Sequence, residues 1–143
     1  MKKTLFLLSI AAFLFCTLTA GARPKGEAGI DFFDKTWKEV SSKARAEHKL
    51  IFLDIYASWC GPCKMLKRET FTNKAVGDYF NANFVNTSFD GEKGDGVMLA
   101  KKYGIQGYPA LFILDADGNI VNSTMGFLPP NELLKFGKDA KKR

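Results

Sequence analysis

Residues 50 to 64 read Leu-Ile-Phe-Leu-Asp-Ile-Tyr-Ala-Ser-Trp-Cys-Gly-Pro-Cys-Lys, and this stretch decides the fold. Its first half, Leu50 to Tyr56, is apolar except for one aspartate, as is typical of a strand that is covered on both faces. Pro62 suits the first turn of a helix, where the backbone amides have no acceptor within the helix. The stretch therefore predicts a buried strand over Leu50 to Tyr56 and a helix from about Pro62 to Glu69.

Two cysteines, Cys60 and Cys63, stand where this helix begins. They are three residues apart, so they lie within one helical turn and can form a disulfide. The positive end of the helix dipole favours a thiolate at Cys60, whereas Cys63 lies deeper in the helix and should remain a thiol. We therefore expect Cys60 to be an accessible nucleophile that attacks a substrate disulfide, and Cys63 to resolve the mixed disulfide.

Two other interpretations of the cysteine pair are a structural disulfide and a zinc site. A disulfide that closes a loop of about four residues contributes only ~2 kcal/mol, and Gly61-Pro62 suits a tight exposed turn rather than a distant cross-link. Zinc needs four ligands, and besides carboxylates only one histidine, His48, is available. Thiol-disulfide exchange is favoured over both, and we expect neither a metal nor a cofactor.

One acid, Asp54, interrupts the predicted strand six residues before Cys60. An unpaired buried carboxylate is costly, so burial should raise its pKa. A carboxyl held near neutrality below the cysteines could take the proton from Cys63 during its attack, which predicts a role in proton transfer. The alternative is that Asp54 points at solvent or at a loop amide.

Helix and strand patterns continue on both sides of this stretch. Before it, Asp34 can cap a helix that ends near His48. After it, the patterns predict a helix over Lys74 to Phe80, a second inner strand over Phe84 to Ser88, a loop over Gly91 to Gly96, a helix stopped by Gly104, strands over Ala110 to Leu114 and Ile120 to Ser123, and a helix over Pro130 to Asp139. Asp117-Gly118 predicts an antiparallel hairpin between the last two strands. This order indicates an α/β fold whose central mixed sheet, with parallel inner strands and an antiparallel edge, is flanked by helices.

The dipeptide Tyr108-Pro109 opens the strand over Ala110 to Leu114. Proline has no backbone N–H, so it belongs at the first residue of a strand or at a sheet edge. Only about 5% of X-Pro bonds in folded proteins are cis, so the local sequence favours a trans bond.

The N-terminus has the pattern of a secretory signal peptide. Two lysines precede an apolar run from Leu5 to about Thr19, and small residues follow. We expect a signal peptide over residues 1–22, a flexible lead-in over 23–29 and a single domain over 30–143. The run is shorter than the ~20 residues of a spanning helix, but an uncleaved membrane anchor remains an alternative. Lipid attachment at Cys16 is disfavoured by the large residue before it.

The charge and cysteine content after cleavage narrow the function further. Without residues 1–22 the chain keeps 19 basic and 15 acidic side chains, a net charge of +4. Such scattered lysines are typical of a solvated surface, so we expect no nucleic-acid binding. Cys60 and Cys63 are then the two remaining cysteines, in a compartment that permits disulfides.

Three segments together resemble the thioredoxin superfamily: Asp54 to Lys64 with its Trp-Cys-Gly-Pro-Cys motif, Tyr103 to Pro109, and Gly126-Phe127. Thr70-Phe71 followed by Val76 adds a similarity to the C-terminal periplasmic domain of DsbD-type thiol:disulfide interchange proteins and their secreted relatives. The resemblance covers about Ile30 to Asp139 and implies a thioredoxin fold.

The resemblance also implies roles for individual residues. Pro109 would be cis and would present the backbone of Tyr108 to an extended substrate. Trp59, with Gly61 and Pro62, would line the same substrate-binding groove, and Asp54 would be the buried acid that handles protons.

Two positions depart from the family pattern. Asn86 stands where thioredoxins carry a lysine near the buried acid. Lys67 stands where the DsbD-type domain carries an acid, one turn beyond the second cysteine. Proton handling is therefore expected to differ from that of the relatives.

The resemblance implies an exported enzyme of the periplasm or cell envelope. It would reduce or isomerise disulfides in other proteins as a monomer, and a membrane thiol-reductant conduit of the DsbD type would supply its electrons. One alternative is an oxidase that donates disulfides, which needs a strongly stabilised Cys60 thiolate. Another is a peptide-binding chaperone that uses the groove around Trp59, Tyr108 and Pro109.

Overall fold

The computed structural model describes residues 28–142. The predicted signal peptide, Cys16 and most of the predicted lead-in lie outside the described residues. Within the described part, no helix combines the length and the apolar character needed to cross a membrane.

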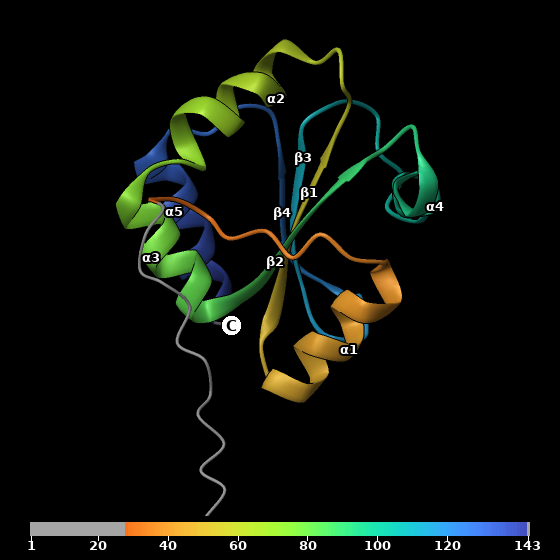
Figure 1. Ribbon diagram of the computed structural model, residues 1–143, viewed down its shortest axis with the longest axis horizontal. Helices are drawn as coiled ribbons and strands as arrows, with labels where there is room; N and C mark the ends of the chain where they lie inside the picture. Colours follow the sequence, from red (N-terminus) through yellow and green to blue (C-terminus); the bar gives the residue numbers. More distant parts are fainter. Residues whose placement is uncertain (1–27, 143) are drawn as a thin grey trace, which may run out of the picture.

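A four-stranded mixed sheet forms the centre of the domain (Figure 1). The strands are β1 (Leu50–Tyr56), β2 (Phe84–Asp90), β3 (Ala110–Leu114) and β4 (Ile120–Met125), in the spatial order β2-β1-β3-β4. β1 pairs in parallel with β2 and antiparallel with β3, and β3 pairs antiparallel with β4. In this register Asp54 lies between Ser88 and Leu111.

Helices cover both faces of the sheet, as Figure 1 shows. One face packs against α1 (Trp37–Glu47) and α4 (Gly94–Lys102). The other packs against the π-helical turn η1 (Leu66–Thr70), α3 (Lys74–Asn83) and α5 (Pro130–Ala140), and η1 continues directly from α2 (Gly61–Met65). Because β1 is apolar on both faces, its side chains contribute to both hydrophobic clusters, Phe52 to the cluster under α3 and α5 and Leu53 to the one under α1 and α4. The predicted α/β fold with flanking helices is confirmed.

The helices differ from the prediction in several details. Thr36, not Asp34, caps α1, because its hydroxyl accepts from the Glu39 amide while the Glu39 carboxylate accepts from the Thr36 amide. α4 begins at Gly94, inside the predicted loop. The helix after the cysteines changes from α to π geometry at Leu66, where the Phe71 amide donates to a carbonyl five residues back.

β2 is an edge strand, so the expectation of a second inner strand is wrong. Its first four residues are nevertheless buried, because the chain before α1 runs alongside it. The Phe33 amide donates to the Asn86 carbonyl, and the Thr87 hydroxyl donates to the Phe33 carbonyl. An apolar sequence predicts that a strand is buried, but it does not predict which part of the chain covers that strand.

The chain before α1, residues 28–36, forms an edge segment alongside β2, and two glycines fix the start of this edge segment. Gly29 has a φ of +125°, and a Cβ on it would lie 2.4 Å from the Phe71 carbonyl oxygen. A Cβ on Gly77 of α3 would lie 2.2 Å from the Gly29 carbonyl oxygen. The Ile30 amide also donates to the Phe71 carbonyl at 2.7 Å. Gly29, which the sequence assigned to the lead-in, is thus packed into the domain.

Candidate active site

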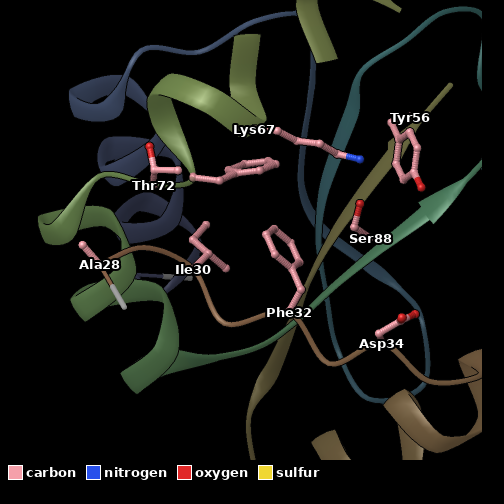
Figure 2. A pocket seen from close by; sticks show the side chains of 9 residues that line it. Ala28, Ile30, Phe32, Asp34, Tyr56, Lys67, Thr72 and Ser88 are labelled. Atoms are coloured by element: carbon pink, nitrogen blue, oxygen red, sulfur yellow. The ribbon is translucent and has the colours of Figure 1, made fainter. Parts of the chain in front are cut away.

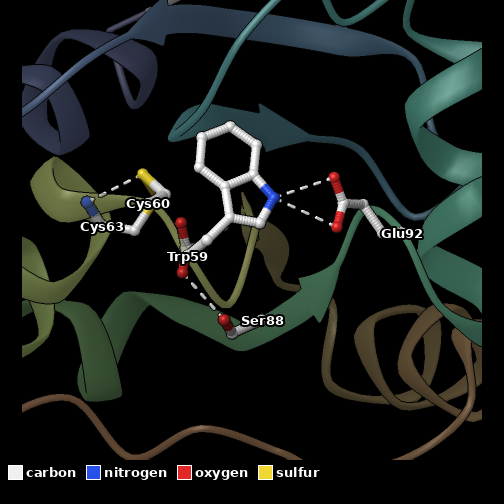
Figure 3. Close-up of a disulfide and its surroundings, with 6 residues drawn as sticks. Trp59, Cys60, Cys63, Ser88 and Glu92 are labelled. Carbon is white, nitrogen blue, oxygen red and sulfur yellow. Dashed lines mark hydrogen bonds between the residues drawn. A yellow bond between two sulfur atoms is a disulfide. The ribbon is translucent and has the colours of Figure 1, made fainter.

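Cys60 and Cys63 form a disulfide at the start of α2 (Figure 3). Cys60 is the N-cap residue in extended conformation, and Pro62 occupies the first turn. The Cys63 amide donates to the Cys60 Sγ at 3.1 Å, so a helix N-terminal N–H points directly at this sulfur. Such an amide and the helix dipole both favour negative charge on Cys60 once the disulfide is reduced.

Both cysteines are buried in this oxidised state, each only 3% exposed. They form a small apolar cluster with Ala57, against which Tyr56 and Tyr108 pack. The expectation that Cys60 is openly accessible is therefore not met in the disulfide form, because the neighbouring aromatic side chains cover the sulfur pair. A substrate has to approach past these rings.

Trp59 stands beside the disulfide and is 67% exposed. Its indole N–H donates to both carboxylate oxygens of Glu92, at 3.1 and 3.2 Å (Figure 3). Its ring meets that of Tyr108 edge to face, with centroids 6.0 Å apart. Glu92 therefore fixes the wall that Trp59 and Tyr108 form. No sequence signal links Glu92 to a tryptophan 33 positions earlier, so sequence analysis missed it.

The Tyr108-Pro109 bond is cis, so the trans bond favoured by local sequence is wrong and the bond implied by the family resemblance is correct. Pro109 is buried, and its carbonyl accepts from the Gly126 amide at 2.8 Å. Tyr108 packs closely on the turn after β2, since a Cβ added to Gly91 would lie 2.7 Å from its ring. Trp59, Gly61, Pro62, Tyr108 and Pro109 were predicted to bind substrate, and this remains a prediction.

Asp54 is buried in the middle of β1, with 1% of its surface exposed. The Ser88 hydroxyl donates to its Oδ2 at 2.8 Å, and among the described residues Oδ1 has no hydrogen-bond partner. Burial raises the pKa of Asp54 to about 6, although the Ser88 hydrogen bond and the charge of Lys67 act in the opposite direction. The predicted rise in the pKa is thus found, and the role of Asp54 in proton transfer stays a prediction.

Asn86 and Lys67, the two residues that depart from the family pattern, contact different groups in the structure. The amide of buried Asn86 donates to the Asn81 side chain at 3.1 Å and to the Asp31 carbonyl at 3.4 Å, so it ties β2 to the edge segment. The Lys67 ammonium lies 3.3 Å from the centroid of the Tyr56 ring. Lys67, rather than a lysine on β2, therefore supplies the positive charge that acts on Asp54.

No three His, Cys, Asp or Glu side chains between residues 28 and 142 lie together as a potential metal site. The chemistry that the arrangement offers is that of the cysteine pair. A four-stranded mixed sheet flanked by helices, with a disulfide at the start of a helix and Tyr108 packed against it, defines a thiol-disulfide oxidoreductase with a thioredoxin fold.

The comparisons with known proteins agree with this class. Residues 37–141 match the family described as a thioredoxin-like domain, and the chain belongs to this family. It is 41% identical to a solution structure described as a "putative disulphide-isomerase" from Bacteroides thetaiotaomicron, with a TM-score of 0.72 over 82% of this chain and 97% of that one. The oxidised C-terminal domain of DsbD from Neisseria meningitidis is 25% identical, with a TM-score of 0.63 over 77% of this chain and 99% of that one.

The full-length DsbD relatives are much longer than the matched region. Thiol:disulfide interchange protein DsbD from Yersinia pestis is 27% identical over 95 residues, which is 64% of this chain but only 16% of that protein. This chain thus corresponds to about one sixth of the length of those relatives.

Proposed function

We propose that the protein is exported and reduces or isomerises disulfides of envelope proteins, with electrons from a membrane conduit of the DsbD type. The observation that carries the proposal is the Cys60–Cys63 disulfide at the start of α2, with the Cys63 amide aimed at the Cys60 sulfur. The predicted signal peptide over residues 1–22 supports export. The similarity to a DsbD domain supports the electron source, and the similarity to a protein titled as a disulphide isomerase supports the substrate class.

The reaction begins with the reduced enzyme. The Cys60 thiolate attacks one sulfur of a substrate disulfide, the substrate S–S bond breaks, and its second sulfur leaves as a thiolate. Cys63 then transfers its proton to the Asp54 carboxylate and attacks the Cys60 sulfur. The bond between Cys60 and the first substrate sulfur breaks, this first sulfur leaves as a thiolate, and the Cys60–Cys63 disulfide seen here is the product. Two electrons and two protons from the membrane conduit restore the dithiol.

The surrounding residues have distinct tasks in this scheme. The α2 N-terminus stabilises the Cys60 thiolate, and Asp54 holds the proton that Cys63 gives up. Trp59 and Tyr108 form the wall against which an extended substrate lies, next to the backbone at Pro109. Gly61 and Pro62 keep the turn between the cysteines free of bulky side chains, so that a substrate chain can approach.

A trapping experiment tests the proposal. A Cys63→Ala variant expressed in its host should accumulate disulfide-linked complexes through Cys60, because resolution is blocked. Mass spectrometry of these complexes identifies the substrates, their compartment and the processed N-terminus together. The Cys60→Ser variant is the matched control and should trap nothing. An absence of envelope proteins among the trapped partners would contradict the proposal.

The direction of electron flow needs a separate measurement. Redox titration against glutathione should give a potential in the reducing range, near that of thioredoxins. A strongly oxidising potential would instead identify a disulfide donor. Full peptide-binding activity in the Cys60→Ser variant, with no loss of function in the host, would identify a chaperone.

A further inference from the structure

A pocket of about 480 Å³ opens beside the buried acid (Figure 2). It has an apolar part and a polar part. The apolar part is formed by Ile30, Phe32 and Phe71, and the polar part by Tyr56, Lys67 and Ser88. Figure 2 shows the Lys67 amine pointing towards Tyr56, with the Ser88 hydroxyl nearby. The polar part thus includes Ser88, the residue whose hydroxyl donates to Asp54.

Ser88 connects the pocket with Asp54. It is half-buried, it lines the pocket, and its hydroxyl donates to the Asp54 Oδ2 at 2.8 Å. The pocket is far larger than the ~10–15 Å³ that one water molecule needs, and it offers several polar partners, so solvent can reach this hydroxyl. Asp54 itself has only 1% of its surface exposed.

Lys67 stands on the same side of the helix as Cys63. The two residues are four positions apart, so their side chains project to one face. The Lys67 ammonium is held over the Tyr56 ring and its charge lowers the pKa of Asp54. Of the described residues that line the pocket, Lys67 is the only cation. It thus favours release of a proton from Asp54 on the side where the pocket opens.

We propose that this pocket is the port through which Asp54 exchanges protons with solvent, with Ser88 as the relay and Lys67 as a positioning residue. The inference rests on the proposed role of Asp54 in accepting the Cys63 proton. Before resolution, the protonated carboxyl passes its proton to the Ser88 oxygen, and the Ser88 hydroxyl passes its own proton to a solvent water, so that Asp54 is free to take the Cys63 proton. Ser88 ends as a neutral hydroxyl, Asp54 as a carboxylate and the water as a hydronium ion, so charge and atoms balance.

The other charged groups around Asp54 are consistent with this direction of transfer. Asp90 follows on β2 and is paired with Lys93 at 3.3 Å, and Asp34 lines the pocket from the edge segment. The pKa of Tyr56 is raised, first by burial and then by the charges of Asp90 and Asp54, so this phenol stays neutral. The shift in the pKa of Asp54 comes from burial, the Ser88 hydrogen bond and the Lys67 charge, so Lys67 is the charged group that acts on this carboxyl, and it favours release of the proton.

Substitutions of Ser88 test whether its hydroxyl acts on the Asp54 carboxyl or only supports the structure around it. In the oxidised protein, Ser88→Ala should shift the titration midpoint of the Asp54 carboxyl upward by about one pH unit, because a hydrogen bond to the ionised form is lost. Infrared difference spectroscopy against Asp54→Asn isolates this carboxyl band. Ser88→Thr keeps the hydroxyl and should restore the midpoint. Ser123→Ala, on the exposed β4 position, is the matched serine control.

Single-turnover kinetics test the relay itself. Reduction of a peptide disulfide, quenched with acid and analysed by mass spectrometry, separates formation of the Cys60 mixed disulfide from its resolution. Ser88→Ala should slow resolution about ten-fold, less than the ~10²–10⁴-fold of direct general acid–base catalysis because Ser88 acts one step away from Cys63, and leave formation unchanged. Added imidazole should restore resolution in Ser88→Ala by carrying the proton, and should have no effect on Asp54→Asn.

Lys67 provides a second variant that should fold whatever the fate of Ser88→Ala, because its side chain is exposed. Lys67→Gln should raise the Asp54 midpoint, Lys67→Arg should restore it, and Lys101→Gln on α4 is the control. If Asp54→Asn resolves the mixed disulfide at the wild-type rate, the proposed role of Asp54 fails. If Asp54→Asn is slow but neither Ser88→Ala nor Lys67→Gln changes rate or midpoint, the port is wrong and the proposed function stands.

Discussion

Replacing Asp54 with asparagine should stabilise the disulfide form of the protein at neutral and alkaline pH. The pKa of Asp54 is raised from 3.8 to about 6 because the folded protein buries it. Each pKa unit corresponds to about 1.4 kcal/mol, so ionising this carboxyl in the folded protein costs about 3 kcal/mol. Asparagine has nearly the same shape and its carbonyl can still accept from Ser88, but it carries no charge. The variant should therefore avoid this cost.

The sign of the pH dependence follows from the raised pKa. Between about pH 4 and pH 6 the folded protein keeps a proton on Asp54 that the unfolded chain has lost, so stability falls as pH rises through this window and is level above it. Urea unfolding of the oxidised proteins at several pH values measures this, since disulfide-bonded cysteines do not titrate. Asp54→Asn should equal wild type near pH 4 and exceed it by about 3 kcal/mol near pH 8.

The outcome that refutes this reasoning is a difference between variant and wild type that does not change with pH. It would mean that Asp54 ionises in the folded protein as easily as in the unfolded chain. Asp78→Asn, at an exposed position of α3, is the matched control and should give no such pH-dependent gain. In Asp54→Asn the resolution step should also slow, so that stability and activity change in opposite directions in this variant.

Three further changes test the site and the fold. Glu92→Ala should free the Trp59 indole and raise KM for a peptide disulfide several-fold with little change for a small disulfide, whereas Glu92→Gln keeps an acceptor oxygen and is the control. Trp59 fluorescence in a Trp37→Phe background measures whether the indole loses its fixed position. An unaltered signal in Glu92→Ala would contradict the proposed role of Glu92. Gly91→Ala should displace the Tyr108 ring and cost about 1 kcal/mol, and a crystal structure with Tyr108 in place would refute this. Thr36→Ala should lower the free energy of unfolding by about 1 kcal/mol in urea titrations, and Asp34→Ala should not; the reverse order would reinstate Asp34 as the cap of α1.

The strands were the most predictable part of the fold. β1 and β3 begin and end at the predicted residues, because each is an apolar run, interrupted in β1 only by Asp54, between segments that contain polar or turn-forming residues. The neighbours of a strand are less accessible to sequence analysis. β2 looked like an inner strand, but its burial comes from the chain at Phe33, about 50 residues earlier, and no local pattern records such a contact.

The same distinction holds for the site. Cys60, Cys63 and Asp54 stand within ten residues of one another in the sequence, so their spacing alone predicted them as members of one site. Ser88 and Glu92 reach Asp54 and Trp59 from 34 and 33 positions away, and only the pairing of β1 with β2 places them there. The cis bond at Pro109 shows a third case, since local statistics gave the wrong isomer and the family resemblance gave the right one.

The paired glycines Gly29 and Gly77, the first of which lies at the start of the described residues, set a practical boundary for the domain. Because Gly29 packs against Gly77, the backbone there has no room for a side chain, and this contact holds the start of the edge segment against the domain. An expression boundary or cleavage site placed after Gly29 would remove this contact, free the edge segment from β2 and leave the hydrogen-bonding groups of β2 open to pairing with another chain. Recombinant versions that begin a few residues too late should therefore aggregate, although every catalytic residue is present.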